Sequence, residues 1–157
     1  MAGFPPLTNQ GNLNRVAVHV VVVGNSALNV TAANLGKQLA AVTFEDVFTD
    51  QIETATGLVN SPRPYVMAQV VLNLLRSQAI AGLWLAQVEV SSNIGQVTVY
   101  SDSSAFPPIE LSNASVVNFA PGAFDGVDAI TKVTVKGIFY VNNALWAGLT
   151  GTLPPAL

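Results

Sequence analysis

One histidine and one group of acidic residues are the side chains whose types and spacing come nearest to a chemical site. His19 lies in the run VAVHVVVV, which is typical of a β-strand. A hydrolytic triad or a histidine metal site needs partner residues at a fitting spacing, and the sequence supplies none around His19. We therefore interpret His19 as a structural residue of a strand.

The acidic group comprises Glu45, Asp46, Asp50 and Glu53. Paired carboxylates can act as general acid and base, or can hold a divalent cation. The interpretation that we favour is a solvated loop or a contact within an assembly. The nearest approach to a phosphate-binding glycine pattern, GAFDG at 122–126, lacks the strand–loop–helix setting that such loops need. The sequence thus predicts no enzyme, no metal site and no cofactor.

The composition favours a surface that faces other protein. Hydrophobic residues make up 50% of the 157 residues and charged residues only 10%, whereas soluble domains carry about 25% charged residues. Because a monomer needs charge to cover its solvent-facing surface, this deficit points to assembly. The net charge is -3 and the six cations are scattered, which argues against a basic stripe that grips DNA.

Membrane insertion and disulfide bonding are both unexpected. A spanning helix needs about 20 consecutive, mostly apolar residues, but the charge-free stretch 16–36 is broken by glycine, asparagine, serine and threonine. Residues 1–14 lack the features of a secretory signal. Cysteine is absent, which excludes disulfides and thiolate metal sites and fits assembly in a reducing cytoplasm.

Hydrophobic periodicity predicts a mainly β domain with one helix. The predicted strands cover 16–23, 39–47, 65–75, 96–101, 110–119 and 129–141. The helix is expected over Gln78–Val90, where Ile80, Trp84 and Val88 recur at helical spacing and should anchor it on a sheet. Ser77 is the predicted helix cap. We expect a single domain over 1–157, with an N-terminal arm (about 1–14) and a proline-rich C-terminal arm (about 147–157).

Several blocks of the sequence, in order, resemble the tail tube proteins of contractile-tailed phages (myoviruses), which are related to type VI secretion tube proteins. The blocks cover most of the chain: PLTNQGNLNRV at 6–16, LNVTAANLGKQL at 28–39, VTFEDVFTDQIETATGLVNSPRPY at 42–65, LNLLRSQAIAGLW at 72–84, IGQVTVYSDSS at 94–104 and KGIFYVNNALW at 136–146. Each block is weak alone, and their order and spacing carry the resemblance.

The resemblance implies two packed β-sheets, in a sandwich or half-barrel, with one flanking α-helix. It further implies homo-hexameric rings that stack into a helical tube whose lumen conducts DNA without specific binding. The partners would be the tail sheath, the baseplate or initiator, the terminator and the tape measure protein. The expected location is the virion tail, after assembly in the host cytoplasm, with no membrane contact.

The same resemblance suggests which residues meet other copies. Contacts between rings are expected from the arm Ala2–Asn14 and the loop Phe48–Pro64. The candidates there are Leu7, Asn9, Gln10, Asn12, Asp50, Glu53 and Arg63. The candidates for lining the lumen, on the strands 65–75 and 129–141, are Gln69, Asn73, Thr131 and Thr134. Lys132 and Lys136 would sit awkwardly in a bore for DNA, so it stays open whether one strand faces outward.

Two other classes of protein remain open from the sequence. One is another viral structural subunit, such as a tube terminator. The other is a non-enzymatic β-sandwich that binds carbohydrate or peptide; such a module should stay monomeric and carry an aromatic or polar cluster on a loop surface.

Overall fold

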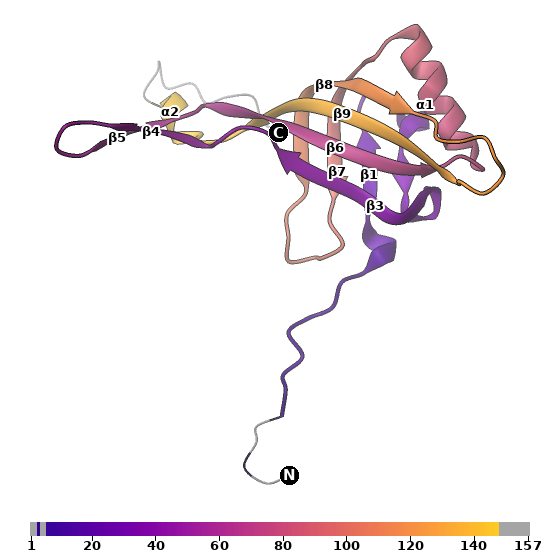
Figure 1. Ribbon diagram of the computed structural model, residues 1–157, viewed down its shortest axis with the longest axis horizontal. Helices are drawn as coiled ribbons and strands as arrows, with labels where there is room; N and C mark the ends of the chain where they lie inside the picture. The colour runs from indigo at the N-terminus through magenta and orange to yellow at the C-terminus, as the bar shows by residue number, and fades with distance from the viewer. Residues whose placement is uncertain (1–2, 4–5, 148–157) are drawn as a thin grey trace.

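A computed structural model describes residues 3 and 6–147 of the chain (Figure 1). Seven strands form one antiparallel sheet in the order β2-β1-β7-β8-β9-β6-β3, and β4 and β5 form a separate two-stranded sheet. The strands are β1 (His19–Val22), β2 (Val30–Thr31), β3 (Leu35–Phe44), β4 (Thr49–Glu53), β5 (Leu58–Pro62), β6 (Tyr65–Leu75), β7 (Asn93–Tyr100), β8 (Ile109–Ala120) and β9 (Ile130–Tyr140). The helices are η1 (Arg15–Ala17), η2 (Ser26–Leu28), η3 (Ala32–Asn34), α1 (Ala79–Val90) and α2 (Ala144–Ala147).

The large sheet curves into a half-barrel around one hydrophobic core (Figure 1). Strand β6 has the predicted bounds, and its alternate residues from Val66 to Leu74 are fully buried. Valines of β1 and β7 reach the same core from the other half of the sheet. The predicted fold class, mainly β with a half-barrel and a flanking helix, is confirmed.

Strand β9 pairs with β6 along its whole length, from Ile130 to Tyr140. A Cβ atom on Gly137 would lie only 3.0 Å from the Cβ of Leu111 and 3.1 Å from the carbonyl oxygen of Ser112. The missing side chain therefore lets β8 lie close against β9, at the point where the β8–β9 register shifts and Asn113 adopts a φ of 51°. Bulges of this kind bend a strand and increase its twist.

The helix α1 begins one residue later than predicted and ends as predicted, at Val90. It packs against η2 and β6. Of the three predicted anchors, Ile80 and Trp84 are buried, while Val88 is partly buried against the core. The predicted cap was wrong: Gln78 occupies the cap position and its side chain makes no capping hydrogen bond.

Two segments differ from the strand predictions. Residues 16–23 form only a short strand, because the Asn14 side chain accepts a hydrogen bond from the Val16 N–H and starts the helix η1 instead. The stretch expected to be a polar loop, 48–64, is a regular hairpin made of β4 and β5. The hairpin continues the β3–β6 ribbon outward, with the Arg63 N–H donating to the Phe48 carbonyl oxygen at 2.9 Å.

Two extensions leave the body of the domain. The β4–β5 hairpin projects from one end of the half-barrel, and residues 6–14 lead away from η1 without helix or strand (Figure 1). The predicted C-terminal arm lies almost entirely outside the described residues. No helix within 3 and 6–147 is long and apolar enough to cross a membrane.

Candidate assembly surfaces

His19 has a structural environment. Its ring stacks on the ring of Tyr100, its partner across the β1–β7 ladder, with centroids 4.1 Å apart and planes 9° from parallel. Its Nδ1 lies 2.7 Å from the carbonyl oxygen of Ala17. The residues that the structure describes contain no group of three or more histidine, cysteine, aspartate and glutamate side chains that could hold a metal ion.

Three of the four acidic residues lie in ion pairs with two different cations rather than in one site. Glu45 lies 2.6 Å from the Nζ of Lys136. The guanidinium of Arg63 donates two hydrogen bonds to Asp50, from Nε at 3.0 Å and Nη2 at 3.2 Å, and lies 3.9 Å from Asp46. The hydrogen bond and the charge of Asp50 raise the pKa of Arg63 above its ordinary value. This forked pair ties the two strands together at the base of the hairpin.

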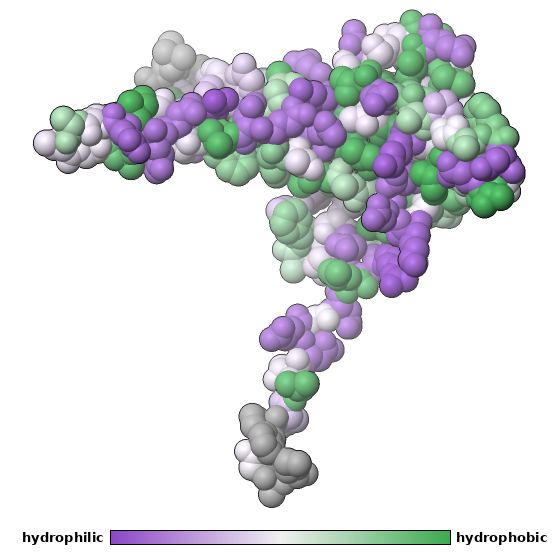
Figure 2. All heavy atoms as spheres, viewed as in Figure 1, coloured by the Kyte–Doolittle hydropathy of each residue, from purple (hydrophilic) through white to green (hydrophobic). Residues whose placement is uncertain are grey.

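The hairpin exposes apolar side chains that its own two strands cannot cover. Ile52 and Val59 are directly paired across the ladder and are 53% and 51% exposed, and Leu58 is 50% exposed. In Figure 2 hydrophobic and hydrophilic residues alternate along the projecting hairpin. A two-stranded hairpin is at best marginally stable alone in water. The hairpin therefore offers a surface that another chain can stabilise, and Glu53 lies exposed on it.

The arm candidates Leu7, Asn9, Gln10 and Asn12 are all exposed, and Leu7 is 101% exposed. The arm is attached to the body where the Asn14 N–H donates to the Asp102 carbonyl oxygen at 2.7 Å. An extended segment with a fully exposed leucine suits a contact with a second chain. Contact between rings through these residues stays a prediction.

Gln69 and Thr134 lie on the outward face of the sheet, opposite the core. Both are half-buried and both alternate with fully buried neighbours. Lys136 is the cross-strand partner of Gln69, and its charge is matched by Glu45 on the same face. Lys132 is exposed. One of the two lysines that seemed out of place in a DNA bore is thus neutralised within the chain.

The structure corrects the placement of the other two lumen candidates. Asn73 is only 7% exposed, and its Nδ2 donates to the Gln38 carbonyl oxygen at 2.8 Å, beside the register shift in β3. Thr131 is 2% exposed on the core face, because it pairs with the buried Leu74, and its hydroxyl donates to the Pro121 carbonyl oxygen. Neither side chain lines an exposed surface.

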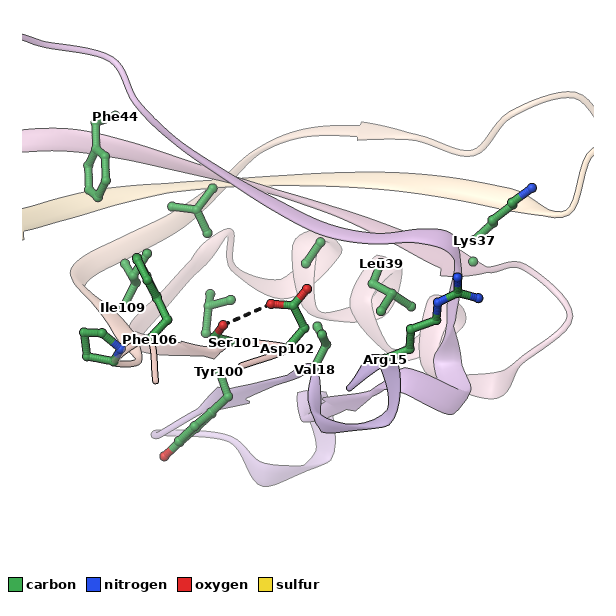
Figure 3. Close-up of a pocket in the computed structure, with 15 residues that line it drawn as sticks. Arg15, Val18, Lys37, Leu39, Phe44, Tyr100, Ser101, Asp102, Phe106 and Ile109 are labelled. Carbon is green, nitrogen blue, oxygen red and sulfur yellow. Dashed lines mark hydrogen bonds between the residues drawn. The ribbon is translucent and has the colours of Figure 1, made fainter. Parts of the chain in front are cut away.

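An apolar groove of about 650 Å³ opens beside β3, the strand at one edge of the sheet. Its other side is formed by η1, the end of β7 and the β7–β8 connection. Phe44, Phe106 and Ile109 lie toward one end, and Arg15 and Lys37 lie at the other (Figure 3). The sequence analysis missed this groove, because its lining comes from segments that only the folded sheet brings together.

The β8–β9 loop is wrapped around Arg76, a contact that the sequence analysis also did not predict. The guanidinium donates from Nη1 to the Pro121 carbonyl oxygen at 2.6 Å and from Nη2 to the Ala123 carbonyl oxygen at 2.7 Å. It also donates to the carbonyl oxygen of Asp128, and its Cζ lies 5.1 Å from the centre of the Phe124 ring. One cation thereby fixes the path of the loop.

Two carboxylates hold the same loop from within. Asp128 accepts from the N–H groups of Ile130 and Ala123, and Asp125 accepts from those of Asp128 and Val127. These backbone hydrogen bonds lower the pKa of both carboxyl groups below the ordinary aspartate value. Each carboxylate therefore stabilises the folded loop while it is ionised.

The lowered pKa values of Asp125 and Asp128 predict that the folded chain is sensitive to acid. A carboxyl group whose pKa is lowered on folding stabilises the protein fully at a pH above the pKa it has in the unfolded chain, about 4. This contribution is lost as the pH falls through the lower pKa that the group has in the folded chain. The variants Asp125→Asn and Asp128→Asn should therefore lose less stability than the parent between about pH 6 and pH 3. Urea unfolding at both pH values measures the difference. Glu53→Gln, on the exposed hairpin, is the control; a pH response of all three variants equal to the parent's would contradict the prediction.

Comparison with known proteins gives little sequence similarity. No family model matches the sequence, and no curated protein matches it. Among solved structures, the chain is similar to the tube terminating cap of the anti-feeding prophage, which was determined by cryo-electron microscopy. The two structures have a TM-score of 0.46 and 14% sequence identity, and the match covers 90% of this chain and 100% of that chain.

Proposed function

We propose that this chain is a non-enzymatic structural subunit of a phage-type contractile tail, and specifically that it builds the inner tube. Six copies form a ring, and rings stack into a hollow cylinder through which DNA passes without specific binding. The sheath surrounds the tube, the baseplate or initiator starts it, and the terminator and tape measure protein limit it. The assembled tube belongs to the virion, and its assembly takes place in the host cytoplasm.

The exposed β4–β5 hairpin is the observation that carries this proposal. It is a regular ribbon, anchored at its base by Arg63 and Asp50, that carries Ile52, Leu58 and Val59 about half exposed. A chain that acted alone would gain nothing from an ordered ribbon that exposes these three apolar side chains outside its core. Contact with another copy would bury these side chains, at about 25 cal/mol for each Å² of apolar surface removed from water.

The arrangement of the blocks that resemble tail tube proteins also supports the proposal. Three of them fall on the arm, on the end of β3 with the hairpin and on the start of α1, which project from the half-barrel or cover it, and the others fall on strands of the sheet, β7 among them. In addition, β3 is a ten-residue strand at the edge of the sheet. Pairing of such an edge with a neighbouring copy protects it from uncontrolled aggregation.

Electron microscopy of the purified protein tests the proposal directly. A tube subunit should give hollow rods of many stacked rings, or rings at low concentration. A tube terminator should give single rings that do not stack. A binding module should stay monomeric in size-exclusion chromatography with light scattering at every concentration, and that result would overturn the proposal.

Deletion of the N-terminal arm should separate folding from stacking. The variant that lacks residues 1–13 should unfold at nearly the same urea concentration as the parent, because the described arm residues up to Leu13 are exposed. It should form rings but not long tubes. Microscopy and urea unfolding of the same sample measure both properties; tubes of normal length from the truncated chain would rule out the arm as a stacking element.

A further inference from the structure

The β8–β9 loop, residues 121–129, displays two apolar side chains on a fixed backbone. Phe124 is 81% exposed and Val127 is 87% exposed. The backbone beneath them is held by three carbonyl contacts of Arg76 and by the hydrogen bonds of Asp125 and Asp128. A segment already ordered in its binding conformation avoids much of the entropy cost of association. The loop therefore has the properties of a pre-formed contact surface. An exposed apolar residue on a backbone without such hydrogen bonds would lack this advantage.

The groove beside β3 has a size and lining that suit this loop tip. Its volume of about 650 Å³ exceeds that of a phenylalanine and a valine side chain together, and its walls include Leu39, Val42 and Phe44. Burying one aromatic side chain removes about 150–250 Å² from water. The groove thus offers an apolar receptor for the two exposed side chains.

The charges at the two surfaces are complementary. The groove carries Arg15 and Lys37 together at one end (Figure 3), and Asp102, whose carboxylate accepts a hydrogen bond from the Ser101 hydroxyl at 3.2 Å. The loop carries Asp125 and Asp128 around Arg76. The loop with Arg76 is therefore net negative, and the groove is net positive. Opposite charges at the rim of an interface guide encounter and fix orientation.

We propose that the 121–129 loop of one copy inserts Phe124 and Val127 into the groove beside β3 of a second copy. Because the loop and the groove are different surfaces of the same molecule, the contact is head-to-tail, and repetition yields a closed ring or an open row. The inference rests on the proposed function, since it assigns one contact between the subunits of the assembly.

Cysteine cross-linking tests the contact, because the chain has no native cysteine. Two differently tagged chains, one with Val127→Cys and the other with Leu39→Cys, are mixed, allowed to assemble and oxidised. The proposal expects a mixed-tag disulfide dimer as the main product. Val117→Cys, on an exposed valine of β8, replaces Val127→Cys in the control mixture and should give little dimer.

Equilibrium measurements give a second, independent readout. Phe124→Ser should weaken association by roughly 30-fold, the equivalent of about 2 kcal/mol of lost burial. Lys37→Glu should also weaken it and make it less sensitive to salt, whereas Lys132→Glu, on the outward face of β9, should not. Sedimentation velocity over a concentration series measures these shifts, and urea unfolding verifies that each variant is folded.

The outcomes separate this contact from the proposed function. Rings or tubes that form normally, without a preferred Val127–Leu39 disulfide and without an effect of Phe124→Ser, would overturn the contact and keep the tube proposal. The specific disulfide in open rows that never close into rings would keep the contact and overturn the tube proposal. A chain that stays monomeric and gives no specific disulfide would overturn both.

Discussion

Replacing Trp84 by alanine is expected to lower the free energy of unfolding by about 3–5 kcal/mol. Trp84 is the largest fully buried side chain and belongs to the main core cluster, so its removal leaves a cavity between α1 and the sheet. The helix would also lose its central contact, because its neighbours Leu83 and Leu85 are 46% and 41% exposed. Urea unfolding, at a concentration where the chain does not assemble, measures the loss.

The matched control is Trp84→Phe. The described residues offer the indole Nε1 no hydrogen-bond acceptor, so phenylalanine forfeits packing volume but no hydrogen bond. Its cost should be nearer 1–2 kcal/mol, roughly what a partial reduction of a core side chain removes. Equal losses for the alanine and phenylalanine variants would show that something other than filled volume makes Trp84 important.

Gly122→Ala should destabilise the β8–β9 loop by about 3 kcal/mol, through backbone strain and a clash that act together. Gly122 has a φ of 86°, where an alanine is strained. A Cβ atom there would lie 2.6 Å from the Ile130 carbonyl oxygen, 2.8 Å from Asp128 Oδ2 and 3.0 Å from Arg76 Nη1. Two of these three atoms take part in the hydrogen bonds around Arg76 and Asp128, so the whole loop must shift. Urea unfolding together with amide exchange at Ala123 and Ile130 measures the effect.

Gly126→Ala isolates the backbone contribution to this effect. Gly126 has a similar φ of 80°, but a Cβ atom there meets nothing within 4 Å. Its replacement should cost only about 1–2 kcal/mol, the strain of a left-handed residue, and should leave amide exchange at Ala123 nearly unchanged. If both glycine variants behave alike, the crowding around Gly122 has no energetic consequence.

The sequence was most informative where the periodic pattern is local. Strand β6 could be located from alternation alone, because one complete face of it meets the core. The helix α1 followed from the spacing of Ile80, Trp84 and Val88. In both cases the pattern of apolar residues that marks the buried face lies within one short segment, so the sequence displays it directly.

The features that the sequence could not reveal depend on pairing across long separations. Arg76 contacts a carbonyl group 45 residues away. Nothing in the composition of the loop 121–129 indicates that Arg76 is the residue that holds it. Asn73 was assigned to an exposed face because its polarity suggested water, yet it satisfies a carbonyl group exposed by the irregular register of β3. The hairpin was mistaken for a polar loop, because exposure on both faces removes the alternation that marks a half-buried strand.

The β4–β5 hairpin follows directly on the β3–β6 ribbon, and its regular pairing gives a simple rule for changing its length. Adding two residues to each strand advances the tip by about 7 Å, and every side chain keeps the side it had, because strand side chains alternate with a period of two. Odd insertions would reverse the sides and misplace Ile52 and Val59. Length variants in even steps would thus act as a molecular ruler, and they would set how far one subunit extends while its half-barrel stays the same.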